Sequence, residues 1–135
     1  MRGMPHLQFE VTEPVDRSEV ASFADRIADL YAGIMDTGTG HVGVTVRDGA
    51  SLALGRADAD DRIAFLNADV RAGRTEGQRR ELAVAVMEEL ADRWDVPTEN
   101  VYVVYTEHPG ADFHLREGPL SSWSSDEAGD GSAPN

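Results

Sequence analysis

The sequence predicts an α+β fold of duplicated β-α-β units, in which two helices cover one face of a four-stranded mixed sheet. The ranges 5–48 and 62–107 each show a strand-like alternation of apolar and polar residues, then a helical apolar stripe, then a second alternating stretch. Each helix would cross over between two parallel strands in the right-handed sense. A chain of 135 residues is long enough for one such domain around a single core.

The first unit begins with an alternating strand from Pro5 to Thr12. Asp16 followed by Glu19 matches a capping box, so a helix is expected over 17–35. Its predicted apolar stripe contains Val20, Phe23, Ile27, Leu30 and Ile34, with Ala24 and Tyr31 at its flanks. After a glycine-containing turn, the stretch Val42–Val46 alternates again and is expected to form the next strand.

The second unit follows a loop that is rich in glycine and aspartate. Residues 49–61 are expected to form this loop, with a short hairpin strand at Ser51–Leu54. A strand that opens at Asp60 or Asp61 then reaches Val70. Thr75 and Gln78 form a second capping-box pattern. The helix that follows is expected to stop at Asp95-Val96-Pro97 and to lead to a last strand over 101–106. Its apolar stripe contains Leu82, Ala83, Val86, Met87, Leu90, Ala91 and Trp94.

The domain is expected to cover residues 5–123. Beyond Glu107 the chain reads as irregular, with apolar anchors at Phe113, Leu115, Leu120 and Trp123. Residues 124–135 contain almost nothing to bury and are expected to be a disordered acidic tail. Residues 1–4 are interpreted as a mis-called or removed N-terminal extension.

Composition narrows the class of function. The net charge is −13, with 25 acidic residues against 12 basic ones, all of them arginine. Such a surface argues against nucleic-acid binding, which depends on neutralising phosphates. It favours a halophilic host whose salt screens self-repulsion, although a GC-rich genome would also favour arginine. The sequence has no cysteine and no apolar run of the roughly 18 residues that a membrane span needs. Its first residues also lack the apolar core of a signal peptide. We therefore expect a cytoplasmic protein without membrane contact.

The sheet face opposite the helices has no cover within one chain. Valine and tyrosine residues of the last strand alternate onto that face. An apolar face of this kind predicts burial against another subunit, so we expect an oligomer.

Two further patterns are rejected on their context. Gly38 to Gly43 matches GxGxxG, but it leaves a helix and enters a strand, so a phosphate would find no helix N-terminus there. Glu107, His108, Asp112 and His114 do not have the spacing of a tetrahedral metal site. We therefore expect neither a metal nor a cofactor, and interpret His6 and His41 as ordinary polar residues.

The chemistry is expected from Pro5, Arg71 and Arg74. The two arginines flank a glycine turn between a strand end and a helix N-terminus, which is a corner that attracts anions, and guanidinium binds carboxylate bidentately. Pro5 follows Met4, so removal of that methionine would leave a secondary amine at the N-terminus. An apolar pocket and two guanidiniums both disfavour its cation, which makes the neutral amine a general base near neutral pH. The plain alternatives are surface arginines and a proline that starts an edge strand.

Together these residues resemble the tautomerase superfamily, whose members share an amino-terminal proline and duplicated βαβ units. The resemblance covers Pro5 to about Trp123. PHLQFEV is similar to the start of 5-carboxymethyl-2-hydroxymuconate isomerase. ENVYVVYTE resembles macrophage migration inhibitory factor, and Tyr102 falls on that family's active-site tyrosine. The strongest resemblance is to the cis-3-chloroacrylic acid dehalogenase group, since VRAGRT matches its paired substrate-binding arginines at Arg71 and Arg74, and EHPGADF resembles its passage from last strand to tail.

The chain also departs from that dehalogenase pattern. Tyr31 stands where the group places an active-site histidine, and Val104 where it has a tyrosine. Leu115 occupies the place of its water-activating glutamate, with Glu117 two residues further on. These departures weigh against hydrolytic dehalogenation and leave proton transfer by proline intact. The resemblance implies a homotrimer with its sites between subunits.

The sequence thus favours a trimeric isomerase that moves a proton between the enol and keto forms of a small 2-oxo acid, provided that Pro5 is the mature N-terminus. Pro5 would be the base, Arg71 and Arg74 would bind the carboxylate, and Tyr31, Tyr102 and Glu117 would contact the substrate. One alternative is a cofactor-independent hydratase or dehalogenase of a 3-substituted acrylate, with a cationic proline as acid and Glu117 or Asp112 activating water. Another is a non-catalytic carboxylate-binding protein with a blocked amine.

Overall fold

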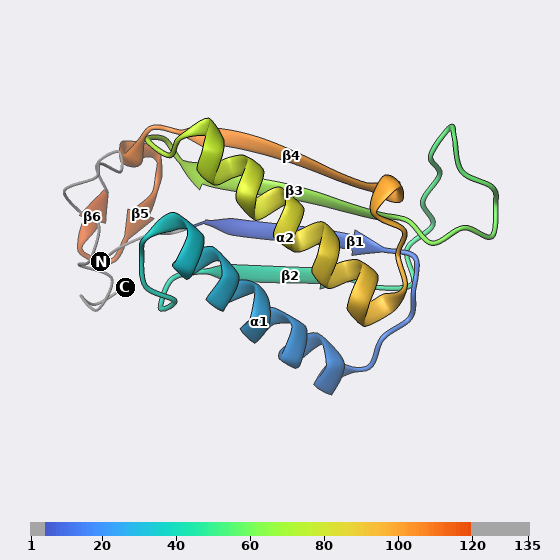
Figure 1. The fold of residues 1–135 in the computed structure, drawn as a ribbon. Coiled ribbons are helices and arrows are strands. Elements are labelled where there is room, and N and C mark those ends of the chain that lie inside the picture. The colour runs from blue at the N-terminus through green and yellow to red at the C-terminus, as the bar shows by residue number, and fades with distance from the viewer. Residues whose placement is uncertain (1–4, 120–135) are drawn as a thin grey trace.

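The structure is a computed structural model that describes residues 5–119. Two βαβ units follow one another along the chain (Figure 1). The first comprises β1 (His6–Val11), α1 (Arg17–Met35) and β2 (Gly43–Arg47). The second comprises β3 (Ala64–Arg71), α2 (Glu76–Trp94) and β4 (Val101–His108), with a 3-10 turn η1 (Thr98–Asn100) before β4. A 3-10 turn η2 (Gly110–Asp112) and the short strands β5 (His114–Leu115) and β6 (Gly118–Pro119) complete the described chain.

The four long strands form one mixed sheet in the order β2-β1-β3-β4. Within each unit the strands are parallel, and the units meet at the antiparallel pair β1–β3, where Leu7 lies opposite Ala68. Both helices lie on the same face of this sheet (Figure 1). The predicted fold class is therefore confirmed.

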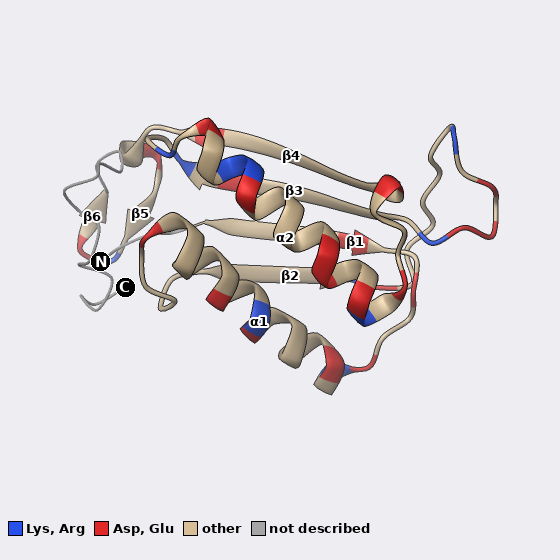
Figure 2. Ribbon diagram, viewed as in Figure 1, with Lys and Arg blue, Asp and Glu red and all other residues tan. Residues whose placement is uncertain are grey.

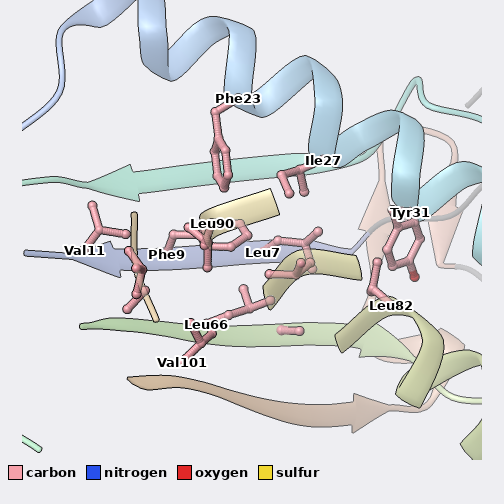
Figure 3. Packing of buried hydrophobic residues seen from close by; sticks show 14 of the residues in the cluster. Leu7, Phe9, Val11, Phe23, Ile27, Tyr31, Leu66, Leu82, Leu90 and Val101 are labelled. Carbon is pink, nitrogen blue, oxygen red and sulfur yellow. The ribbon is translucent and has the colours of Figure 1, made fainter. Parts of the chain in front are cut away.

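The core fills the space between the helices and the sheet (Figure 3). Phe23 of α1 packs at its centre, with ring centroids 4.9 Å from Phe9 and 4.5 Å from Trp94. The predicted stripe of α2 is confirmed by the burial of Leu82, Val86, Leu90 and Trp94. The predicted stripe of α1 is confirmed at Phe23 and Ile27, but the buried row continues through Tyr31 and Met35 instead of Leu30 and Ile34. Leu30 and Ile34 are only partly buried, since they line a groove beside α2 rather than facing the sheet.

Both helix starts form as predicted, with one difference. At α2 the capping box is complete: Thr75 Oγ1 accepts from the N–H of Gln78, and Gln78 Oε1 accepts from the N–H of Thr75, each at 3.0 Å. At α1, Asp16 accepts from the N–H of Glu19 at 2.9 Å, and this bond lowers the pKa of Asp16. The Glu19 carboxylate lies instead 3.2 Å from Nη1 of Arg93, so it joins α1 to α2.

Three predictions about the connections were wrong. Ser51–Leu54 forms no strand, because the loop is held by Arg56, whose Nη1 donates to the carbonyl of Glu99 and to Oδ1 of Asn100 at 2.9 Å each. β3 starts at Ala64 rather than at Asp60 or Asp61, since the N–H of Asp61 turns back to the carbonyl of Asp58. The stretch after β4 is ordered into η2 and the β5–β6 pair. The expectations for residues 1–4, Leu120, Trp123 and 124–135 lie outside the described residues.

Charged residues lie mostly on the helices and loops of the described chain, with a few on the strands, and acidic residues outnumber basic ones (Figure 2). Within residues 5–119, neither helix is apolar enough over sufficient length to cross a membrane.

Candidate active site

Pro5, Arg71 and Arg74 gather at one end of the sheet. In the antiparallel β1–β3 pair His6 lies opposite Asp69, so Pro5 is level with Val70, directly before Arg71. Pro5 is buried, and its carbonyl accepts from the N–H of Gly43 at 3.0 Å. The structure therefore brings together the three residues that the sequence predicts for catalysis.

The turn between β3 and α2 sets the two arginines three residues apart at this corner. Gly73 has a φ of 123°, a backbone region that side-chain-bearing residues rarely adopt. The N–H of Ala72 bonds to the carbonyl of His108 at 2.8 Å and fixes the turn to the end of β4. The glycine thus allows β3 to reverse into α2 with Arg71 and Arg74 on either side.

Both guanidinium groups are buried. Arg71 is 3% exposed and Arg74 is 5% exposed. Nε of Arg74 donates to the carbonyl of Met35, the last residue of α1, at 3.0 Å. Burial of a cation is costly unless anions or dipoles compensate it, and the C-terminal end of a helix is negative. Two buried guanidiniums beside Pro5 make this corner suited to a carboxylate.

Tyr31 joins these arginines from α1. Its side chain is 1% exposed, and Figure 3 shows its ring pointing down from α1 beside Leu82. Burial raises the pKa of Tyr31, and the charges of Arg74 and Arg71 partly oppose this rise. The phenol is therefore a neutral hydrogen-bond donor close to both guanidiniums.

The sequence reasoning missed Tyr105 and Arg79, which support the turn between β3 and α2 through hydrogen bonds. The hydroxyl of Tyr105 donates to the carbonyl of Arg79 at 2.7 Å, and Nη1 of Arg79 donates to the carbonyl of Arg74 at 3.0 Å and also pairs with Glu107. Burial, and then Tyr31, raise the pKa of Tyr105, with Arg79 opposing. The signal was present, because Tyr105 shares its strand face with Val101 and Val103, the inward residues of β4.

Tyr102 does not join this corner within one chain. It lies opposite Phe65 near the start of β4, whereas Pro5 is level with Val70. Five residues along a strand separate these levels by about 17 Å. Tyr102 is also 53% exposed, on the sheet face that no helix covers. Only a Tyr102 from another subunit would reach the Pro5 corner.

Glu117 lies in the turn between β5 and β6, and it is exposed. The β5–β6 pair lies at the same end of the molecule as the start of β1 (Figure 1). Glu117 is therefore placed near this end, on a hairpin rather than on the sheet.

The described residues contain no cluster of three or more histidine, aspartate or glutamate side chains able to hold a metal ion. His108 pairs with Asp69 at 2.9 Å and packs edge-on against the ring of Phe113. The GxGxxG stretch connects α1 to β2, as its sequence context indicates.

Comparison with known proteins gives matches among solved structures. No family model and no curated protein matches the chain. A protein called N1, described as a member of the cis-3-chloroacrylic acid dehalogenase family, superimposes with a TM-score of 0.75 at 26% identity, covering 89% of this chain and 87% of that one. By its fold, the chain belongs to the tautomerase superfamily.

Two other members of this superfamily give similar superpositions. The protein MIF2 of Leishmania major has a TM-score of 0.74 at 13% identity, covering 88% of this chain and 99% of that one. The protein Pt0534, whose crystal structure is of a form inactivated by 2-oxo-3-pentynoate, has a TM-score of 0.72 at 19% identity, covering 85% and 94%. At these identities the two likenesses show the tautomerase fold alone.

Proposed function

We propose that this chain is a tautomerase-like isomerase that transfers a proton between the enol and keto forms of a small 2-oxo acid. The observation that carries the proposal is the position of two buried guanidiniums, Arg71 and Arg74, beside Pro5 at one end of the sheet. The neighbour inactivated by a 2-oxo acid and the neighbour from a family named after a chloroacrylic acid both support a carboxylate as the ligand.

Arg71 and Arg74 bind the substrate carboxylate, and their charge stabilises the enolate that forms during transfer. The nitrogen of Pro5, when it is the N-terminus, removes a proton next to the carbonyl and returns it at the other end of the enol system. Burial and nearby positive charge both disfavour a protonated amine, so the proposed base is the neutral amine of an N-terminal Pro5. Tyr31, neutral and close to both arginines, donates a hydrogen bond to the substrate.

In the proposed site, Tyr102 and Glu117 also contact the substrate. In a homotrimer with sites between subunits, Tyr102 of one chain would line the Pro5 corner of its neighbour. Glu117 would contact substrate from the β5–β6 hairpin.

The test compares two forms of the protein, one that starts at Pro5 and one that keeps residues 1–4. Ketonisation of phenylpyruvate enol, which absorbs in the near ultraviolet, provides the assay. We expect activity in the form that starts at Pro5 and at least a hundredfold loss in the longer form, where the amide nitrogen is not basic, in Pro5→Ala and in Arg74→Ala. Intact mass establishes the N-terminus of each preparation. Equal activity of the two forms would falsify the role of Pro5.

A second candidate follows from the similarity to the cis-3-chloroacrylic acid dehalogenase family. In it, cationic Pro5 protonates an acrylate while Glu117 or Asp112 activates water. A rate that falls above an alkaline pKa, with chloride released from 3-chloroacrylate, favours this reaction, whereas a rate that falls below an acidic pKa favours the tautomerase. Binding of phenylpyruvate that is unchanged in Pro5→Ala, without turnover, favours a non-catalytic carboxylate-binding protein.

A further inference from the structure

The C-terminal end of α1 is completed by side chains from the start of α2. The last carbonyls of a helix lack partners within that helix. Here the carbonyl of Ala32 accepts from the N–H of Thr37 at 3.1 Å, just beyond the helix. Ile34 and Met35 are the last two residues of the helix. Gln78 Nε2 donates to Ile34 at 3.3 Å, and Arg74 Nε donates to Met35 at 3.0 Å.

This contact fixes the direction of the Arg74 guanidinium. A guanidinium binds a carboxylate either side-on, through Nε and one Nη, or end-on, through Nη1 and Nη2. Because Nε–H of Arg74 is committed to the Met35 carbonyl, the end-on edge is the one that can hold a carboxylate bidentately. The last turn of α1 contains no basic residue, so Arg74 also supplies the positive charge that the negative helix end favours.

Arg79 fixes the backbone of Arg74. Its Nη1 donates to the Arg74 carbonyl at 3.0 Å and pairs with Glu107 at the end of β4. The carbonyl of Arg79 in turn accepts from the hydroxyl of Tyr105 at 2.7 Å. Arg74 is thus tied to α1 through its side chain and to β4 through its main chain.

Gln78 serves two helix ends with one amide group. Its Oε1 accepts from the N–H of Thr75, the residue after Arg74, at 3.0 Å, and its Nε2 donates to the Ile34 carbonyl of α1. Glutamate at this position would keep the first bond, since it is equally suited to a capping box, but would have no proton for the second. Gln78→Glu therefore separates the cap of α2 from the bridge to α1.

We infer that Gln78 and Arg79 are positioning residues that orient Arg74 for the substrate carboxylate. This inference rests on the proposed function, and it adds residues that do not themselves touch the ligand. It predicts that the affinity for carboxylates depends on the contact between the end of α1 and the start of α2.

The first measurement is calorimetric binding of phenylpyruvate and of its uncharged methyl ester to the form that starts at Pro5. In Gln78→Glu and in Arg79→Gln we expect the acid to bind about tenfold more weakly and the ester to bind as in the parent. A tenfold change corresponds to the loss of about one hydrogen bond between the guanidinium and the charged carboxylate. Arg79→Lys keeps a cationic donor and should restore the affinity to within about threefold. Val84→Glu adds the same charge as Gln78→Glu on an exposed part of α2 and should bind like the parent.

The second measurement follows the arginine Nε–H signals by ¹H–¹⁵N NMR, with Arg74→Lys identifying that of Arg74. This buried proton should exchange slowly in the parent and at least about tenfold faster in Gln78→Glu and Arg79→Gln. The two variants act by different routes, so if one does not fold the other decides.

The outcomes separate the inference from the proposed function. If the parent binds the acid no better than the ester, the proposed carboxylate site is wrong, and the Nε–H exchange alone decides whether the two residues orient Arg74. If the parent prefers the acid and Arg74→Ala loses that preference, while Gln78→Glu and Arg79→Gln keep both parent affinity and slow exchange, the inference is overturned and the proposed function stands.

Discussion

Tyr31 shows how one buried polar residue is tolerated at the corner that also holds Arg71 and Arg74. Its phenol is almost completely removed from solvent, yet it lies within the field of two cations. Desolvation outweighs that field, so the neutral form is favoured. A neutral phenol next to guanidiniums is a donor that adds no negative charge to compete with an anionic ligand.

Titration of the tyrosines tests this environment. The chain has three tyrosines, and burial raises the pKa of Tyr31 and of Tyr105. At about pH 10.5, just above the ordinary pKa of tyrosine, Tyr31→Phe and Tyr105→Phe should show the same tyrosinate absorbance as the parent, because both phenols are still neutral in the folded protein. In denaturant each variant should show one tyrosinate less.

The raised pKa values of Tyr31 and Tyr105 also predict how the stability of the folded protein changes with pH. Because each phenol has a higher pKa in the folded protein, the unfolded chain ionises first as the pH rises. The contribution of each phenol to the free energy of unfolding is therefore fully present below about pH 10 and is lost at higher pH. Urea midpoints of the parent should therefore fall more steeply above pH 10 than those of Tyr31→Phe. A lower tyrosinate absorbance of folded Tyr31→Phe than of the parent at about pH 10.5 would contradict this account.

At this scale the sequence predicts the residues of the site better than their partners. Pro5, Arg71 and Arg74 were predicted from a strand start, a glycine turn and a helix start, and these local features do bring them together. Tyr31 came only from the resemblance, since its position on the flank of the expected stripe gave no reason to bury it. The strand pattern indicated that Tyr105 faces inward, but its bond to Arg79 was missed because the two residues lie 26 positions apart, which no local pattern records.

At the scale of elements, the helix ends carry the information that organises the site. The start of α2 was predicted in detail because a capping box is a local signal, and Thr75 and Gln78 form it as expected. The end of α1 at Met35 was predicted, but the partners of its last carbonyls were not, because Arg74 and Gln78 lie about 40 residues further along the chain. The loop over 49–61 was predicted correctly, but the short strand expected in it at Ser51–Leu54 does not form, and Arg56 anchors the loop to the distant residues Glu99 and Asn100.

The capping box gives a prediction for the stability of α2. Thr75→Ala removes the hydroxyl that accepts from the N–H of Gln78, and it should lower the free energy of unfolding by about 1 kcal/mol. Thr75→Ser keeps the acceptor and should lie within a few tenths of a kcal/mol of the parent. Urea denaturation monitored by circular dichroism measures both, and equal losses in the two variants would show that the methyl group, not the hydroxyl, matters.

At the scale of the whole molecule, the helices cover one face of the sheet and leave the other open (Figure 1). Tyr102 and Val104 of β4 are each 53% exposed on that open face, whereas Val101 and Val103 of the same strand pack into the core. The face also carries polar contacts, including the bond from Gln8 to Asp69 at 3.3 Å. The homotrimer remains a prediction, and this face is where it would bury surface.

Assembly is tested by a charge placed on that face. Val104→Glu should shift the protein from a trimer to a monomer in analytical ultracentrifugation, because an interface would have to bury an uncompensated carboxylate. Val84→Glu alters an exposed valine on the helical layer and should leave the mass unchanged. A parent that sediments as a monomer would rule out a trimer. It would also remove the route by which Tyr102 reaches a Pro5 corner.

The hydrogen bond from Arg74 to Met35 joins the two halves of a duplicated fold in an unequal way. Each half contains its own strands and helix, and the loop between β2 and β3 is the only covalent link between them in the described chain. Cutting that loop would leave two fragments, one with the arginines and one with the helix end that orients Arg74. Neither fragment alone would have an oriented guanidinium, whereas the two fragments reassociated would regain it. Duplication of one unit gives the sheet, but only the docking of one copy against the other gives the site.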